Sequence, residues 1–423
     1  MPPRASLLFA RAQSVCLRLL SVCLRLPLFA LHHYHDVSAA AVSPDGGLIA
    51  PRVMIVSMWT PEASAWHSRF HESDLGNLSA VAVTVPGLSM LFPHVLCTAD
   101  GRVCQLTVGE GEINAAASMM ALVLSSHFDL GQTYFLIAGI AGVNPRHATL
   151  GSVALARFAV QAALQSEIDP RSLPANWTTS YIPYGRDRPF QYPTVTYGTE
   201  VFEVNDGLRH AAFLLASRAT LADDDASRRY RALYAADGQG RYAKATQPPA
   251  VAKCDCTTSD VYYSGTILSQ VFERTTEVWT NGTGVYCMAA QEDNATLEVL
   301  VRAAVQRTLD FSRVILLRAG SDFDRPPPGV SDWHHLTRVD QNGFATALDN
   351  MYRAGIEIVK GLVADWNSTF RRGIAPSNYL GDILGSLGGS PDFGPGSITG
   401  GKPVEPAGAG GYCDKRRRRR HRR

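Results

Sequence analysis

The chain has 423 residues, of which 46% are hydrophobic and 18% charged, a composition that excludes disorder throughout and allows one large domain or two ordinary ones. Its net charge of +2 is carried at the ends, with +2 in residues 1–50 and +5 in residues 374–423, so residues 51–373 are mildly acidic at −5 and give no support to a nucleic-acid-binding role. No eighteen consecutive residues are apolar, so a membrane-spanning helix, and with it a pore or carrier of the usual kind, is not expected.

The first 41 residues are basic and apolar, which is typical of a leader segment. The apolar stretch Leu19–Leu31 is followed by the small residues Ser38 to Ala41, as in a secretory signal with a cleavage site. Arg4, Arg11 and Arg18 come with no early acidic residue, which is equally typical of a transit peptide, so both interpretations stay open. A secretory signal would make the protein secreted or associated with the cell surface or endomembranes.

The body of the chain alternates apolar, strand-like runs with stretches of helical periodicity. This alternation favours a single α/β domain over residues 50–373, with a mostly parallel sheet and helices on both faces. The expected strands are 52–57, 134–139 and 312–318, and the expected helices are 115–127, 296–309 and 344–367.

Ligands of parallel α/β proteins bind where strands end, and the first two such places follow the early strands. In Met58–Ala63, Pro61 suits the first turn of a helix, and Glu62 either favours the helix dipole or faces a pocket as a base. Val108–Ala116 is a glycine turn that opens a helix, and Gly109 would let the backbone approach a ligand closely.

Two further places follow later strands. Ala138–Pro145 is either a plain turn or a strand that runs into small residues, against which a flat ligand could lie. In Leu316–Arg325, Arg318, Ser321 and Asp322 leave the end of an apolar strand within five residues. A partly buried Asp with a raised pKa could donate a proton to a leaving group, an effect typically worth about 10² to 10⁴ in rate.

Residues 374–411 contain eleven Gly and five Pro, and residues 415–423 are almost wholly basic. Such a segment predicts a disordered tail from residue 374 onward. Its basic run is either a solvated charge run, or an arm for anionic surfaces or a nuclear-type address.

The cysteines and the sequons indicate whether the chain could form disulfides, bind a metal or be glycosylated. Cys97 and Cys104 could close a hairpin, while Cys254 and Cys256 are too close to pair with each other, so a buried small hydrophobe is the general expectation for the cysteines. No second Cys or His pair stands at zinc spacing, so no metal site is predicted. Five sequons would suit a glycoprotein: Asn77, Asn176, Asn281, Asn294 and Asn367.

The ordered motifs M-x-x-P-E-A, G-x-G-x-x-N-A-A, A-G-x-A-G and R-A-x-S-D resemble those of the nucleoside phosphorylase and nucleosidase superfamily. Residues 50–373 look like the purine nucleoside permease family of fungi and bacteria. The resemblance implies an α/β three-layer sandwich with a mixed central sheet flanked by helices, and a possible homo-oligomer.

The resemblance also implies roles for residues at the base of a purine nucleoside. Asp322 would protonate N7 of the departing purine, and Ser321 and Arg318 would hold that Asp. Ala141 and Gly142, together with Gly109, would line the sugar and the base.

On the sugar, Glu292 would grip the ribose hydroxyls, with Gln291 in the place of the usual Met, which puts the apolar floor under the sugar in doubt. Glu62 falls near the position of a water-orienting Glu in the hydrolytic nucleosidases. Cleavage of an N-glycosidic bond builds positive charge on the ribose and negative charge on the base, so a carboxylate near one and a proton donor near the other suit the reaction. The stretch Cys254–Gly265 is either an aromatic wall of the site or a core strand and turn.

The resulting hypothesis is binding and uptake of purine nucleosides, with cleavage by water or phosphate as an open possibility. No cofactor or metal is expected, and phosphate is a possible co-substrate. The alternatives are a nucleoside-binding protein without turnover and an interaction protein that acts through its basic tail.

Overall fold

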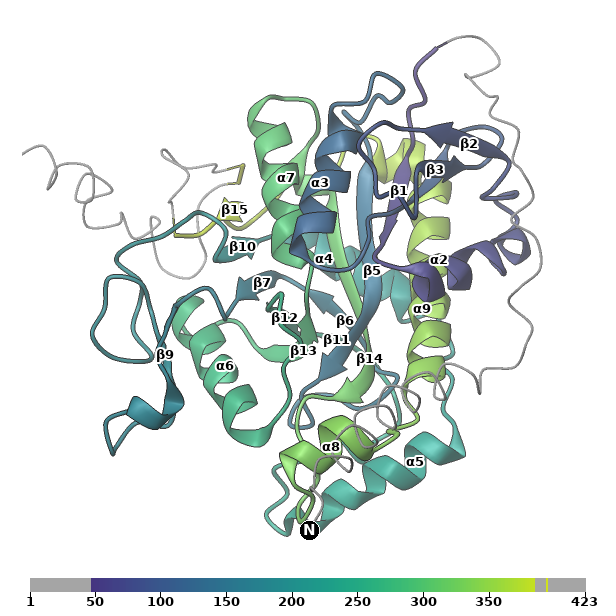
Figure 1. The fold of residues 1–423 in the computed structure, drawn as a ribbon. Helices are drawn as coiled ribbons and strands as arrows, with labels where there is room; N and C mark the ends of the chain where they lie inside the picture. The colour runs from purple at the N-terminus through teal and green to yellow at the C-terminus, as the bar shows by residue number, and fades with distance from the viewer. Residues whose placement is uncertain (1–46, 385–392, 395–423) are drawn as a thin grey trace, which may run out of the picture. The chain divides into compact units, whose positions relative to one another are not determined.

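The apolar strands of the body come together in one mixed sheet. The computed structural model describes residues 47–384 and 393–394, and within them β1 (Val53–Ser57) lies between β4 (Val103–Thr107) and β5 (Tyr134–Val143), parallel to both. β14 (Val314–Phe323) is parallel to β5, whereas β13 (Tyr286–Ala290) is antiparallel to it (Figure 1).

Ten further strands complete the described part of the fold. Eight extend the large sheet: β2 (Val81–Thr84), β3 (His94–Cys97), β6 (Val153–Ala156), β7 (Phe158–Gln161), β10 (Val201–Glu203), β11 (Val251–Lys253), β12 (Asp255–Thr258) and β15 (Gly381–Asp382). Two form a separate short ribbon: β8 (Ser166–Glu167) and β9 (Tyr181–Ile182).

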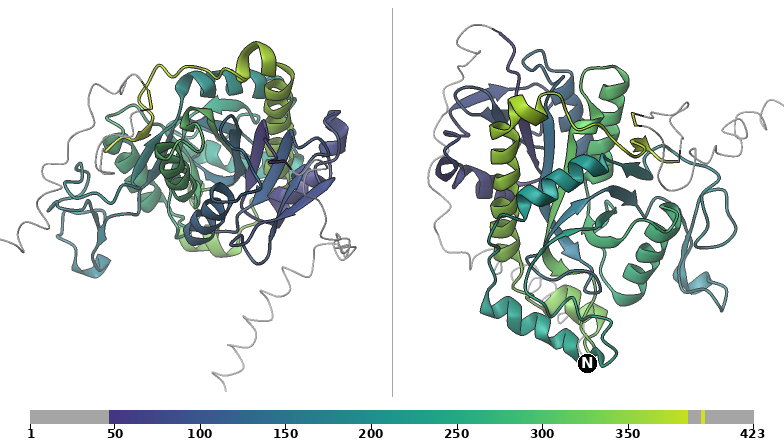
Figure 2. Two further views of the ribbon diagram at one scale, coloured as in Figure 1. Left: turned by 90° about the horizontal axis from the view of Figure 1, so that it is seen from above. Right: turned by 180° about the vertical axis from the view of Figure 1, so that it is seen from behind.

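Helices cover both faces of the sheet because its strands are apolar on both sides. Along β1, Met54 and Val56 pack with α3 (Glu112–Val123) and α7 (Asp293–Val305), whereas Val53 and Ile55 pack with α4 (Asp206–Ala216) and α9 (Phe344–Ala364), as the alternation of side chains along a strand requires. α3 and α7 lie in front in Figure 1, and α4 and α9 come to the front in the view from behind in Figure 2. The α/β arrangement of a mixed sheet between helix layers, which the resemblance implied, is therefore confirmed. The mostly parallel sheet favoured by the alternation is wrong, since β6 is antiparallel to β14, β7 to β10 and β2 to β3.

The remaining α-helices of the described residues are α2 (Thr60–His67), α5 (Asp225–Arg231), α6 (Thr266–Trp279) and α8 (Asp332–Arg338). α2 reaches α9 through Trp66, whose indole lies directly over Gly355: a Cβ at that position would come within 2.5 Å of the ring. The glycine in the middle of α9 thus allows the two helices to pack closely. No helix among residues 47–384 is long and apolar enough to cross a membrane.

The predicted elements exist, but their bounds differ from the expectation. α3 and α7 each begin three residues earlier than predicted, and β5 and β14 extend past Gly139 and Arg318, the residues at which they were expected to end. Residues 138–143 are therefore strand, and the alternative of a plain turn there is wrong. A register shift between Gly320 and Asp322 forms a bulge in β14, which turns the strand where the candidate residues lie.

The expectation of a disordered tail from residue 374 is wrong for residues 374–384. β15 pairs with β10, and Tyr379 and Leu380 are fully buried. Tyr379 completes a small core with Phe158 and Val201, and Leu380 joins the larger core. The Gly and Pro content averaged over the segment concealed them. The predicted leader (residues 1–41) and the basic run (residues 415–423) lie outside the described residues.

Two disulfides join neighbouring strands in the described part of the chain. Cys97–Cys104 links β3 to β4, in agreement with the expected hairpin, and Cys254–Cys287 joins the residue before β12 to β13. The expectation of a small buried hydrophobe holds for Cys256, which is buried and free, but is wrong for these four cysteines, since their partners lie across adjacent strands.

Candidate active site

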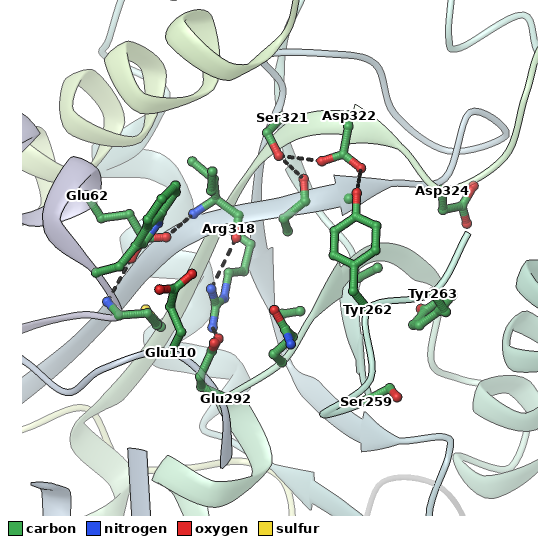
Figure 3. A pocket seen from close by; sticks show the side chains of 18 of the residues that line it. Glu62, Glu110, Ser259, Tyr262, Tyr263, Glu292, Arg318, Ser321, Asp322 and Asp324 are labelled. Atoms are coloured by element: carbon green, nitrogen blue, oxygen red, sulfur yellow. Dashed lines mark hydrogen bonds and ion pairs between the residues drawn. The ribbon is translucent and has the colours of Figure 1, made fainter. Parts of the chain in front are cut away.

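A cavity of about 300 Å³ opens where β1, β5, β13 and β14 end (Figure 3), a volume at the lower end of ordinary small-ligand sites. Its walls bring together segments more than 250 residues apart in the chain. Eight of the nine residues predicted for the site line it: Glu62, Ala141, Gly142, Gln291, Glu292, Arg318, Ser321 and Asp322.

Gly109 is the exception, and the expectation that it lines the site is wrong. It is buried beside the cavity with φ +93°, and a Cβ there would come within 2.9 Å of Asn114 Cβ. Its role is therefore to make the tight left-handed turn from β4 into α3. The adjacent Glu110 lines the cavity instead.

Glu62 satisfies both of the alternatives left open for it, since it lies in the first turn of α2 and also faces the cavity. One carboxylate oxygen accepts a hydrogen bond from the Met58 N–H at 2.7 Å, and the other accepts one from the Ile140 N–H at 2.8 Å. Only 1% of the residue is exposed. Burial raises the pKa of Glu62 to about 7, against the opposing effect of the Arg318 charge.

Arg318 is the centre of a buried ionic cluster. Its Nη2 donates to Asp293 at 2.6 Å and lies 3.4 Å from the Glu292 carboxylate, its Nε donates to Asp293 at 3.1 Å, and its Nη1 donates to the Ile140 carbonyl at 3.2 Å. Burial lowers the pKa of Arg318, but Asp293 and Glu292 outweigh this and raise it above its usual value. The expectation that Arg318 holds Asp322 is wrong, because alternation along β14 and the bulge direct the two side chains to different partners.

Gly139 explains how this cluster fits against β5. A Cβ at that position would lie 2.5 Å from Arg318 Nη1 and 2.7 Å from Glu62 Oε1. The glycine therefore leaves the space that the guanidinium and the Glu62 carboxylate occupy.

Glu292 occupies the start of α7, where the helix dipole favours an acidic side chain. Its carboxylate accepts a hydrogen bond from the Gly111 N–H at 3.1 Å, and burial raises its pKa. The neighbouring Gln291 lines the cavity, while its amide donates to the Asp260 carbonyl at 2.8 Å.

Asp322 lies on the opposite side of the cavity, held by two hydroxyl groups. Ser321 Oγ is 2.6 Å from one carboxylate oxygen and Tyr262 OH is 2.5 Å from the other. Burial raises the pKa of Asp322. Ser321 and Asp322 are consecutive yet both line the cavity, which a regular strand would forbid and the bulge permits.

The stretch from Cys254 combines both of its alternatives, since β12 is a buried strand and Tyr262 and Tyr263 line the cavity. Behind them Tyr263 OH donates to Tyr286 OH at 3.0 Å, and Tyr286 OH donates to Asp324 at 2.5 Å. Asp324 in turn pairs with the buried Arg325 at 2.8 Å.

The cavity thus has two chemically different sides, which Figure 3 shows left and right. The ionic side consists of Glu62, Glu292, Arg318 and, behind them, Asp293. The hydroxyl side consists of Ser321, Asp322 and Tyr262. A group that develops positive charge would be stabilised on the ionic side, and a leaving group that needs a proton could receive it from Asp322.

Sequence reasoning missed three residues that shape these sides: Asp293, Glu110 and Asp324. In the sequence Asp293 is only a neighbour of Glu292, and its spacing gives no sign that it pairs with Arg318. Tyr262 is recognisable as an aromatic residue, whereas its hydrogen bond to Asp322 has no signal in the sequence. Among residues 47–384, no group of three or more His, Cys, Asp or Glu side chains is arranged to hold a metal ion.

Comparison with known proteins identifies related sequences over most of the chain. The sequence profile of the family described as purine nucleoside permease (NUP) matches residues 50–375. A purine nucleoside permease of Candida albicans is 41% identical over 351 residues, which cover 81% of this chain and 83% of that protein. A probable purine nucleoside permease of Schizosaccharomyces pombe is 39% identical over 325 residues, covering 75% of this chain and 90% of that protein.

Solved structures give more distant matches. The 5′-methylthioadenosine/S-adenosylhomocysteine nucleosidase of Neisseria meningitidis is similar with a TM-score of 0.42 and 15% identity, covering 74% of this chain and all of that one. The corresponding nucleosidase of Helicobacter pylori is similar with a TM-score of 0.43 and 12% identity, covering 75% of this chain and 99% of that one.

Proposed function

The chain belongs to the purine nucleoside permease family, and from that premise we propose that its cavity binds purine nucleosides for uptake and cleaves their N-glycosidic bond. The observation that carries the proposal is the meeting of Glu292 and Asp322 in one cavity of nucleoside-compatible size. Glu292 would bind the ribose hydroxyls, and Asp322 would give a proton to N7 of the purine.

The two sides of the cavity support this orientation of the substrate. The ionic side, with a surplus of carboxylates over its one guanidinium, would stabilise positive charge on the ribose as the bond breaks. The hydroxyl side would lie at the base, where Tyr262 and Tyr263 offer faces for a purine ring. Glu62, with a pKa near neutrality, would orient the attacking group and take up its proton.

The direct test is to incubate purified protein with adenosine, guanosine and inosine, with and without phosphate, and to separate the products by chromatography. We expect release of free base. Tight nucleoside binding without any base release would contradict cleavage and leave binding for uptake as the function of the cavity.

Binding is tested separately by calorimetry. We expect saturable binding of a purine nucleoside, weakened by Glu292→Ala. The matched control is Glu298→Ala, which removes a carboxylate from the same helix that pairs with Arg302 outside the cavity. Wild-type protein that binds no purine nucleoside would defeat both binding and cleavage.

We also propose that the leader directs the chain into the secretory route. Two disulfides suit an oxidising compartment, and four of the five sequon asparagines are exposed: Asn77, Asn176, Asn281 and Asn367. Asn294 is buried and donates to the Thr199 carbonyl at 2.7 Å, so it is unsuited to glycosylation in the folded chain. Protein from a secreting host should lose mass on treatment with an N-glycanase; an unchanged mass would count against the proposal.

A further inference from the structure

Resting on the proposed function, we propose that the cavity selects uncharged nucleosides and rejects phosphate groups, so that water and not inorganic phosphate attacks the sugar. The same property would exclude nucleotides. Three features of the described residues support this inference.

The first feature is the charge of the lining. Five carboxylates face the cavity, and Arg318 is the one cationic side chain among the described residues that line it. Asp322 is neutral while it holds the proton for N7, and Asp324 is paired with Arg325. The other three carboxyl groups, Glu62, Glu110 and Glu292, still outnumber Arg318, so an anion entering this space meets a surplus of negative charge where water screens poorly. The carboxylates are Glu62, Glu110, Glu292, Asp322 and Asp324.

The second feature is that the guanidinium of Arg318 is already occupied. Sites that recognise phosphate present arginine forks with free N–H groups. Here Nε and Nη2 donate to Asp293, Nη2 also faces Glu292, and Nη1 donates to the Ile140 carbonyl. With 2% of the residue exposed, Arg318 is a structural cation within an anionic cluster.

The third feature is that side-chain carboxylates of this chain fill backbone positions that suit an anion. Helix starts and turns bind phosphate through their N–H groups. Around this cavity the Met58 and Ile140 N–H groups are bound by Glu62, and the Gly111 N–H before α3 is bound by Glu292. A phosphate would have to displace these carboxylates to reach the same donors.

With water as the attacking group the reaction balances without any further reactant. The water oxygen forms a bond to C1′ of the ribose, and the bond from C1′ to N9 of the purine breaks, its electron pair passing to the base. Asp322 gives its proton to N7, and Glu62 accepts a proton from the water. The products are free purine and ribose.

The test compares adenosine with adenosine 5′-monophosphate in calorimetry at fixed ionic strength, and base release in phosphate with base release in chloride. We expect the monophosphate to bind at least a hundredfold more weakly and phosphate not to accelerate base release. Equal binding of the two, or base release that depends on phosphate with ribose 1-phosphate as product, would overturn the inference while leaving the proposed function intact. Failure of adenosine itself to bind would instead defeat the proposed function.

Glu110→Gln tests whether the negative charge of the cavity lining causes the weaker binding of adenosine 5′-monophosphate. Glu110 is exposed, and among the described residues its side chain accepts no hydrogen bond that ties it to the fold, so the variant should fold. We expect the ratio of adenosine affinity to monophosphate affinity to fall several-fold. The matched control is Glu167→Gln on the exposed β8, which should keep the wild-type ratio; an unchanged ratio in Glu110→Gln would contradict the role of the lining charge.

Discussion

The ionic side and the hydroxyl side of the cavity each hold a carboxylate with a raised pKa, but they do so by different means. On the ionic side, Glu62 and Glu292 are fixed by backbone N–H groups around the guanidinium of Arg318. On the hydroxyl side, Asp322 is held by two neutral side-chain hydroxyls. The first arrangement resists the entry of anions and holds charge in place, whereas the second leaves a carboxyl group that can exchange a proton.

The largest effect on the difference between the two sides should come from removing Arg318, the cation at the centre of the ionic side. Arg318→Met leaves Asp293 and Glu292 as buried negative charges without a cation beside them, so we expect a loss of about 3 to 5 kcal/mol in the free energy of unfolding. Urea denaturation measures it. The control Arg302→Met removes an arginine whose side chain is 63% exposed and should cost less than about 1 kcal/mol; similar losses in both variants would show that the ionic side is not a buried cluster.

The hydroxyl side should respond in rate and not in stability. Asp322→Asn keeps the shape of the side chain and one of its two acceptor oxygens but removes the acidic proton, so we expect base release to fall about 10² to 10⁴-fold. Nucleoside affinity should change little. A variant that keeps more than a tenth of the wild-type rate would show that another group protonates the purine.

Titration of Glu62 makes the stability of the ionic side depend on pH. Its pKa rises from 4.5 to about 7 on folding, so between these values the folded chain holds a proton that the unfolded chain has released. The stabilisation is therefore complete below pH 4.5 and is lost as the pH rises through 7, a change of roughly 3 kcal/mol.

Unfolding free energies measured at pH 5, 6 and 7 for the wild type and Glu62→Gln would test this. The difference between the two proteins should change steadily with pH over this window, since Gln cannot titrate. Parallel pH profiles would place the pKa of Glu62 near its ordinary value and weaken its assignment as a proton acceptor.

The periodicity of the sequence is sufficient to predict the layers of the fold and the gathering of the site. β1, β5 and β14 are apolar on both faces, and parallel strands bring their carboxyl ends to one edge, so the sequence alone places Glu62, Ala141 and Asp322 together. The sequence does not show which way the side chains point or which partners they bind. Arg318 and Asp322 are four residues apart on one strand, yet a bulge and the buried Asp293 separate their roles.

The same limit applies to glycines and to the end of the domain. Gly109 and Gly139 look alike in the sequence, but the first makes a turn beside the cavity and the second makes room for Arg318 within it. Tyr379 and Leu380 are buried in a segment whose average composition indicates disorder. In each case the deciding contact depends on the folded backbone, which local patterns do not report.

The smallest expected effect concerns the hydroxyl that holds Asp322. Tyr262→Phe removes one hydrogen bond to the carboxyl group, worth about 1 kcal/mol, so the maximal rate of base release should fall about fivefold. Burial raises the pKa of Asp322 and the Tyr262 hydroxyl opposes this, so loss of the hydroxyl should also move the alkaline limb of the rate profile to higher pH. Tyr263→Phe is the matched control, since its hydroxyl donates to Tyr286 and not to Asp322. If the alkaline limb moved by the same amount in both variants, the general polarity of the aromatic wall, and not the contact with Tyr262, would set the pKa of Asp322.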